Sequence, residues 1–340
     1  MHTFKKTSFV LLYITFFLTP ICAQKKESFI KIEPYAGFTN GTLEEILYYS
    51  FPSDKKISLL EWERKLFIYG AELKTAFKNF NLNAEFETAP KNAKSGQMRD
   101  SDWLNTNDYS MKTTYSQGTN FSKEYYSAEV SFFYDIKAAK NFTVSPVLSA
   151  EYSYDSFYRK KGAEGWYSED CRHWWHDSSS KHYPYYNPET GKTLKLAQID
   201  YLRHTFFSWT GIKFRLKPGQ KIEFALSLFA SPVSYFYSID THYAQDKSTK
   251  LMYKKHYRQR QFSYFNSIKI NLDTALSLSK RFDLNLGLET LFNIKNGRGD
   301  LYSDYHSDEY QGEYVNSGQK TSSTLKSIKA KIGCTVKLMD

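Results

Sequence analysis

The chain has 340 residues, enough for one large β domain or two ordinary domains, and a formal net charge of +10. Aromatic residues make up 18% of it, yet mean hydropathy is −0.58, and beyond the N-terminal segment no apolar run is long enough for a membrane helix. Together with a secretion signal, this composition is typical of a transmembrane β-barrel. Export argues against nucleic acid as the partner of the basic charge, and favours an anionic lipid surface.

The N-terminal residues predict that secretion signal. Lys5 and Lys6 form a positive segment, residues 9–18 are apolar, and an Ile-Cys-Ala cleavage site follows. A membrane anchor is the alternative, but the apolar stretch is too short to cross a bilayer comfortably. We therefore expect that residues 1–23 are removed and that residues 24–340 form a single barrel domain.

Apolar and polar residues alternate with a period of two from one end of the chain to the other. In residues 142–154, for example, Phe142, Val144 and Leu148 share one face, while the opposite face is polar. This pattern predicts strands with one apolar face. Ten strands are predicted, approximately at residues 28–48, 57–76, 80–99, 125–137, 141–159, 196–216, 221–242, 257–279, 282–299 and 323–338.

Short and long connections between these strands take turns along the chain. The longer polar segments are residues 49–57, 101–124, 160–195, 243–257 and 300–322. A soluble sandwich would have shorter strands and more evenly spaced turns. We therefore predict an all-β fold, a ten-stranded antiparallel up-and-down transmembrane barrel with short periplasmic turns and long extracellular loops. A porin function is disfavoured, because ten strands leave little open lumen.

Two pairs of chemically reactive side chains end outward-running strands. Asp100 and Asp102 follow the third strand, and Asp240 and His242 end the seventh. Side chains two residues apart in an extended chain point to the same side. Strands three and seven lie nearly opposite each other in a ring of ten, so the two pairs should face one another over a groove. An Asp-x-Asp pair alone is weak support, since most such pairs are solvated or bind cations.

Strict alternation would, however, point both pairs outward. Phe224 on the lipid-facing side of the seventh strand has the same parity as Asp240. A one-residue bulge is therefore required, and Ser231-Pro232 is the expected place because proline interrupts the hydrogen-bond ladder. The third strand has the same conflict, and its irregularity is expected near Pro90 and Gly96.

Several segments resemble the omptin family of outer-membrane proteases, in order and spacing over the whole mature chain. Residues 96–103, Gly-Gln-Met-Arg-Asp-Ser-Asp-Trp, look like the family's Gly-Asn-Met-x-Asp-x-Asp-Trp motif, and residues 240–243 like its Asp-x-His-Tyr motif. Residues 57–62 resemble the start of its second strand, and residues 295–297 with 301–302 the outer end of its ninth. The resemblance implies a monomer in the outer membrane of a Gram-negative-type bacterium, with its active site facing outside.

The resemblance also implies an aspartic-type endopeptidase that needs neither a metal nor a covalent intermediate. His242 would act as the base, since imidazole titrates near neutrality. Asp240 would orient the ring, Asp100 would share the attacking water with His242, and Asp102 would tune Asp100. The alternative for Asp240 and His242 is a solvated loop.

Substrate preference depends on two further positions. Alignment with the family places Glu45 in the pocket for the residue before the scissile bond, where a carboxylate favours Arg or Lys. The family's second acid, two residues before the Asp of its Asp-x-His motif, is Ser238 here, which weakens that preference. The expected partners are peptides or proteins, without a cofactor.

Lipopolysaccharide or a similar anionic lipid is a candidate activator. Residues 151–159 do not reproduce the family's lipid-binding pattern. The basic side chains nearby form either a lipid-phosphate patch or solvated loop charges: Arg159, Lys160, Lys161 and Arg203.

The third long loop contains a Cys-x-His-x-x-His sequence, Cys171, His173 and His176, with His182 further on. Sulfur and imidazole suit zinc, but the spacing is non-standard, so substrate or surface contact is the other interpretation. We expect no metal site.

A non-enzymatic barrel of the same ancestry, acting as an adhesin or structural protein, is the competing hypothesis. Ser238, the weak lipid-site match and the non-aromatic C-terminus favour it, whereas retention of all four candidate catalytic side chains argues against it.

Overall fold

The computed structural model describes residues 29–49, 55–105, 108, 110, 112–160, 164–168, 182–184, 186–187, 192–193, 198–245, 252–294, 297–307 and 315–339. The expected secretion signal, Lys161 and the Cys171, His173 and His176 segment lie outside the described residues, as does the side chain of His182.

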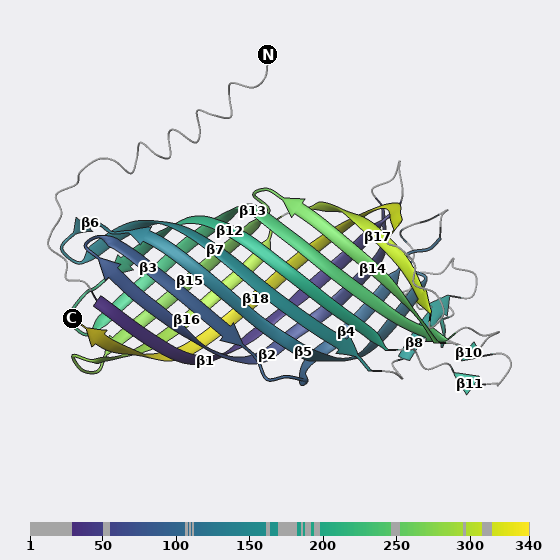
Figure 1. Cartoon of the computed structure of the whole chain (residues 1–340), viewed down its shortest axis with the longest axis horizontal. Coiled ribbons are helices and arrows are strands. Elements are labelled where there is room, and N and C mark those ends of the chain that lie inside the picture. Colours follow the sequence, from purple (N-terminus) through teal and green to yellow (C-terminus); the bar gives the residue numbers. More distant parts are fainter. Residues whose placement is uncertain are drawn as a thin grey trace, which may run out of the picture.

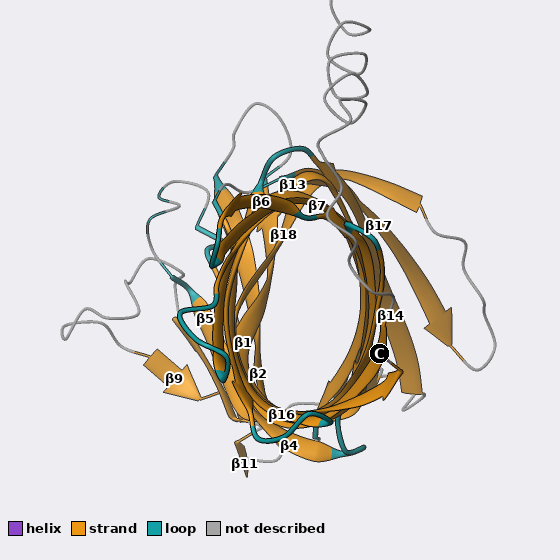
Figure 2. Cartoon of the chain, turned by 90° about the vertical axis from the view of Figure 1, so that its left-hand side faces the viewer, coloured by secondary structure: helices purple, strands orange, loops and turns teal. Residues whose placement is uncertain are grey.

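The described residues form a ring of ten antiparallel strands, three of which consist of two consecutive segments. The strands are β1 (Phe29–Tyr48), β2 (Lys56–Phe77), β3 (Phe80–Thr88) with β4 (Ala93–Asp102), β5 (Thr114–Tyr134), β7 (Phe142–Arg159), β12 (Ile199–Leu216), β13 (Ile222–Gln245), β14 (Met252–Ser263) with β15 (Ser267–Ser277), β16 (Phe282–Asn293) with β17 (Arg298–Ser307), and β18 (Val315–Met339). β18 pairs with β1 and closes the ring. The predicted fold class and strand number are confirmed (Figures 1 and 2).

Five short strands lie outside this ring. β6 (Ile136–Ala139) pairs with β7 near the end of the barrel where the chain's C-terminus lies (Figure 1). The other four are β8 (Glu164–Ser168), β9 (His182–Pro184), β10 (Tyr186–Asn187) and β11 (Lys192–Thr193). β8 extends the sheet from β5 at the opposite end, which we call the rim. No helix in the described part of the chain is long and apolar enough to cross a membrane.

The strands reach further toward the rim than predicted. β5 begins at Thr114, and β17 continues to Ser307, although residues 101–124 and 300–322 were expected to be loops. The sequence pattern is lost there because both faces are polar. The backbone still needs hydrogen-bond partners, and the neighbouring strand supplies them.

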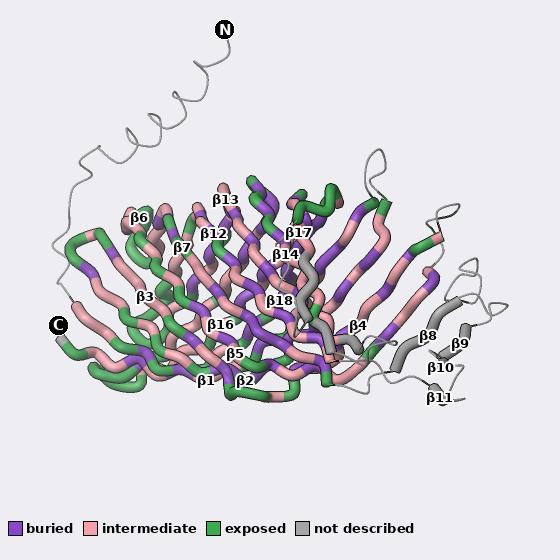
Figure 3. The backbone as a smooth tube through the Cα atoms, turned by 45° about the vertical axis from the view of Figure 1, so that its right-hand side comes forward, coloured by how far each residue is buried: buried purple, intermediate pink, exposed green. Residues whose placement is uncertain are grey.

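Large apolar side chains form an exposed belt on the outer wall. The belt includes Phe38, Phe67, Phe86, Phe132, Phe206, Phe224, Leu228, Phe262, Leu286 and Ile332, each at least 38% exposed. An apolar outer band of this kind is the surface that a barrel presents to lipid. Burial and exposure alternate along the strands, as Figure 3 shows.

The inner wall is polar and charged, and many of its charged side chains pair across the lumen. Fully buried Lys269 contacts Glu129 at 2.7 Å and Glu151 at 2.9 Å. Lys329 similarly contacts Glu87 at 2.7 Å and Glu289 at 3.3 Å. Because buried charges are costly unless paired, each of these lysines needs its carboxylate partners in the interior.

Both predicted strand irregularities are present. Ser208 pairs with Val233 but Thr210 pairs with Ala230, so β13 carries one extra residue at Ser231-Pro232. Even-numbered side chains of β13 therefore point outward before the bulge and inward after it.

Between β3 and β4 a turn intervenes. Asn92 has positive φ in this turn, and Gly96 has positive φ within β4, where the register shifts. Phe86 is 53% exposed, whereas Met98, of the same parity, is completely buried. Each irregularity turns one of the reactive pairs toward the interior of the barrel.

Candidate active site

Asp240 and His242 lie on β13 beyond the apolar belt, at the rim. Nε2 of His242 is 2.6 Å from Oδ2 of Asp240, and the imidazole edge packs against Tyr257 at 5.3 Å between ring centroids. Burial lowers the pKa of His242, but the charge and hydrogen bond of Asp240 outweigh it, so the ring's pKa lies above its ordinary value. The contact holds the imidazole in one orientation and stabilises its protonated form.

Asp100 and Asp102 lie on β4, between β2 and β5. Thr114 donates a hydrogen bond to Asp102 at 2.6 Å, whereas Oδ1 of Asp100 is buried and receives none from the residues that the structure describes. Burial and the neighbouring Asp102 raise the pKa of Asp100 to about 8, and burial raises that of Asp102. Near neutral pH, Asp100 therefore holds a proton for much of the time.

The charges of the two pairs act on each other inside the barrel. Around the ring, β5, β7 and β12 separate β4 from β13. The charge of His242 lowers the pKa of Asp100, and the charge of Asp100 raises that of His242. Both pairs therefore turn toward the same interior, within range of each other's charge. An electrophile between them would have a base on one side and a carboxyl group on the other.

Arg159 lies on the inner wall between the two pairs. Its cross-strand partner is Ile199, whose partner on the other side is His242. It is 3% exposed and donates a hydrogen bond to Ser116 at 2.8 Å; Ser116 is itself the cross-strand partner of Asp100. Its positive charge lowers the pKa of Asp100 and of His242.

The sequence interpretation of Arg159 and Arg203 was wrong. Both were expected either in a lipid-phosphate patch or as solvated loop charges, but Arg203 is completely buried and Arg159 nearly so. Arg159 has the same parity as the polar face of its strand, Ser149, Glu151 and Ser153, which was the available signal. That face points into the barrel.

Glu45 and Ser238, the two predicted specificity residues, contact each other next to the Asp–His pair. Ser238 donates a hydrogen bond to Oε1 of Glu45, and each residue is 1% exposed. Burial and nearby Asp240 raise the pKa of Glu45 to about 7, while Ser238 and the positive charge of Arg203 lower it. Glu45 thus lies close to the Asp–His pair, and its carboxyl group is already engaged by Ser238.

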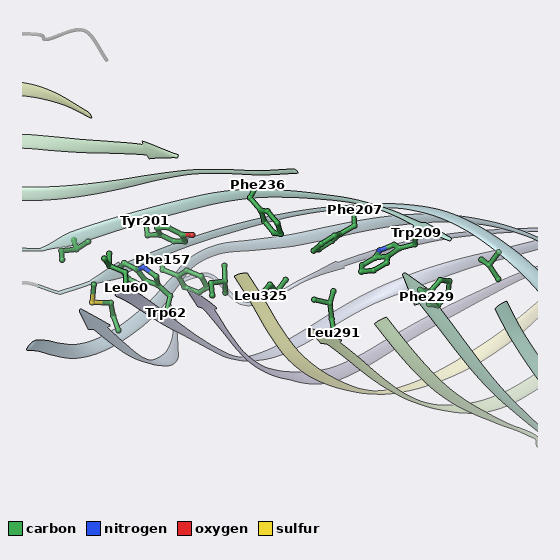
Figure 4. Close-up of a cluster of buried hydrophobic side chains, with 14 residues drawn as sticks. Leu60, Trp62, Phe157, Tyr201, Phe207, Trp209, Phe229, Phe236, Leu291 and Leu325 are labelled. Atoms are coloured by element: carbon green, nitrogen blue, oxygen red, sulfur yellow. The ribbon is translucent and has the colours of Figure 1, made fainter. Parts of the chain in front are cut away.

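A cluster of buried apolar side chains extends inward from the site. Trp62 stacks on Tyr201 at 5.1 Å and on Phe157 at 6.1 Å between ring centroids (Figure 4). Leu60, the cross-strand partner of Asp100, and Met98 belong to the same cluster. These side chains keep water from the interior side of the site, which strengthens the electrostatic interactions within it.

No group of three or more His, Cys, Asp or Glu side chains suited to a metal ion occurs among the residues that the structure describes.

Fold and site together define a closed ten-stranded barrel with opposed Asp–Asp and Asp–His pairs at its rim. Residues 27–333 match the Omptin family, and the chain belongs to this family. It also resembles the crystal structure of the outer membrane protease OmpT from Escherichia coli, with a TM-score of 0.72, 14% identity, and coverage of 93% of this chain and 99% of that chain.

Other solved barrels are much less similar. The toluene transporter TodX from Pseudomonas putida gives a TM-score of 0.30 at 7% identity, over 91% of this chain and 89% of that chain. The transport unit of the autotransporter AIDA-I from Escherichia coli gives 0.30 at 10% identity, over 97% and 96%. No curated protein sequence matches the chain.

Proposed function

We propose that the chain is an outer-membrane endopeptidase that activates water between His242 and Asp100, with the site on the outside of the cell. Membership of the omptin family, the likeness to an outer membrane protease and the exposed apolar belt support this placement. The observation that carries the mechanism is the 2.6 Å contact between His242 and Asp240, opposite a carboxyl group with a raised pKa.

The roles of the side chains follow from their protonation. With Nε2–H of His242 donating to Asp240, Nδ1 is the nitrogen that accepts a proton from the attacking water. Oδ1 of Asp100 is an available acceptor that orients the same water. The water oxygen bonds to the peptide carbonyl carbon, and its proton passes to His242. Asp240 stabilises the resulting imidazolium.

Collapse of the tetrahedral intermediate needs a proton on the leaving amide nitrogen. The imidazolium of His242, or the protonated carboxyl group of Asp100, supplies it as the carbon–nitrogen bond breaks. Burial and Asp102 keep the pKa of Asp100 high, whereas His242 and Arg159 limit that rise. Asp100 and His242 can therefore both exchange protons near neutral pH.

Cleavage of a fluorogenic peptide by refolded protein tests the proposal. His242→Ala should remove most activity while the barrel remains folded, as judged by heat-modifiable migration on gels. Asp200→Asn is the matched control, because this carboxylate on β12 bonds Gln198 and Tyr243 and not the site. Full proteolysis by purified His242→Ala protein would exclude the mechanism. Parallel assays with and without lipopolysaccharide show whether anionic lipid activates the enzyme.

A preference for Arg or Lys before the scissile bond would require Glu45 to offer its carboxylate to the substrate. That carboxylate is 1% exposed and already accepts a hydrogen bond from Ser238. The charges around it therefore decide the substrate class.

A further inference from the structure

We propose that Arg203 determines substrate specificity, by supplying from within the chain the positive charge that a basic substrate would otherwise bring to Glu45. The residue before the scissile bond would then be uncharged. This inference rests on the proposed function, and concerns the same site.

The backbone places Arg203 beside the specificity residues. Arg203 is the cross-strand partner of Ser238, which donates a hydrogen bond to Glu45. Two residues nearer the rim, Tyr201 of β12 pairs with Asp240 of β13. Side chains two residues apart on a strand share a face, so Arg203 and Tyr201 both point toward the interior at the level of the catalytic pair. Arg203 is completely buried there.

The guanidinium group is held firmly. Nη1 donates to the carbonyl oxygen of Thr324 at 2.7 Å, and Nε donates to Thr205 at 3.2 Å. The group also lies over the ring of Phe236, 4.5 Å from its centroid. A guanidinium that is fixed on three sides is a permanent part of the site and does not swing away when a substrate enters.

Glu45 lies among both negative and positive charges. Burial and the negative charge of Asp240 raise the pKa of Glu45, and the positive charge of Arg203 lowers it, so Arg203 partly offsets the acidic surroundings of Glu45. A substrate Arg or Lys at this place would meet that like charge in a buried setting, where repulsion is poorly screened. Specificity is often set by such a repulsive element as much as by attraction. Arg203 therefore reduces the usual advantage that a carboxylate gives to basic residues.

The guanidinium group of Arg203 has hydrogen-bonding capacity left for a substrate. Nη2 of Arg203 is buried and has no hydrogen-bond partner among the described residues. A buried N–H group without a partner is unfavourable, and an uncharged acceptor such as a side-chain amide oxygen would satisfy it. The hydroxyl of Ser238 adds a second polar group at the same place. An uncharged polar side chain such as Gln matches this set better than a cation does.

The experiment uses four peptides that differ only in the residue before the scissile bond, which is Arg, Lys, Gln or Ala. The kcat/KM of the refolded wild-type protein should be at least tenfold higher for the Gln and Ala peptides than for the Arg peptide. Arg203→Met keeps the length and removes the charge, and should reverse this order. Arg203→Lys should keep the wild-type order. Arg260→Met is the matched control, because its exposed guanidinium lies over Tyr237, 5.9 Å from the ring centroid.

Each outcome separates the two proposals. Wild-type preference for Arg or Lys would overturn the role of Arg203 and leave the endopeptidase proposal standing. Cleavage of none of the peptides by folded wild-type protein would count against the endopeptidase proposal itself. Equal loss of activity on all peptides in folded Arg203→Met would show a merely structural role and overturn the inference.

If Arg203→Met fails to fold, Arg203→Gln provides the second variant. It also removes the charge, while keeping a hydrogen-bonding side chain, and should raise kcat/KM for the Arg peptide relative to the Gln peptide at least tenfold. An unchanged ratio would overturn the inference.

Discussion

Asp240→Asn removes the charge that stabilises the imidazolium while keeping the size of the side chain. At the observed 2.6 Å, two unit charges attract by roughly 6 kcal/mol at an effective dielectric constant of ~20. Loss of one charge from a buried hydrogen-bonded pair costs about 2–5 kcal/mol. The side chain of His242 is 34% exposed, so solvent screening favours the lower part of that range, about 2–3 kcal/mol. Since 1.36 kcal/mol is tenfold in rate, kcat/KM should fall about 30- to 150-fold.

The assay is peptide cleavage as a function of pH. Asp240 raises the pKa of His242, so its neutralisation lowers that pKa and moves the acid limb of kcat/KM to lower pH. Asp200→Asn, the same chemical change one strand away, should leave both the rate and the profile within about twofold, since surface changes away from the site have small effects. A rate for Asp240→Asn within threefold of wild type, with an unmoved acid limb, would refute the role given to Asp240.

Three further changes test other parts of the structure. Arg159→Met removes a charge that lowers the pKa of Asp100 and of the imidazole, so the acid limb should move to higher pH; a shift to lower pH would contradict this. Gly96→Ala places a Cβ 2.4 Å from Oε2 of Glu63, at a φ of +118°, and should lower both the thermal midpoint and the rate; an unchanged midpoint would show that β4 adapts. Lys269→Met removes the cation shared by two partly buried carboxylates and should destabilise the barrel by about 3–5 kcal/mol in denaturant titration, with kcat/KM retained while it is folded; unaltered stability would count against the lumenal ion pairs.

The sequence was sufficient for the parts of the fold where lipid imposes a pattern. Within the apolar belt one face of each strand is apolar and the other polar, so the ten strands could be located by alternation. The conflict of parity between Phe224 and Asp240 even located the bulge at Ser231-Pro232. Short motifs then placed Asp100 and His242 on opposite walls.

Beyond the belt both faces of a strand are polar, so inward and outward side chains can be separated only by the parity carried over from the belt. Arg159 and Arg203 were consequently interpreted as surface charges, whereas both lie inside the barrel. Their roles depend on which strands pair and in what register, and these are properties of the closed ring rather than of any one segment. The contact between Ser238 and Glu45, which are far apart in sequence, is of the same kind.

The bulge at Ser231-Pro232 decides which face of β13 carries the reactive side chains at the rim. Deleting one residue there would leave the belt half of β13 in register, because Ile222 to Ala230 would still pair with β15. Every side chain from Ser234 onward would exchange faces, and His242 would point away from the interior. Such a protein would insert and fold as a barrel, yet carry its histidine on the outer wall. Length changes in this short interval should therefore be excluded from active relatives.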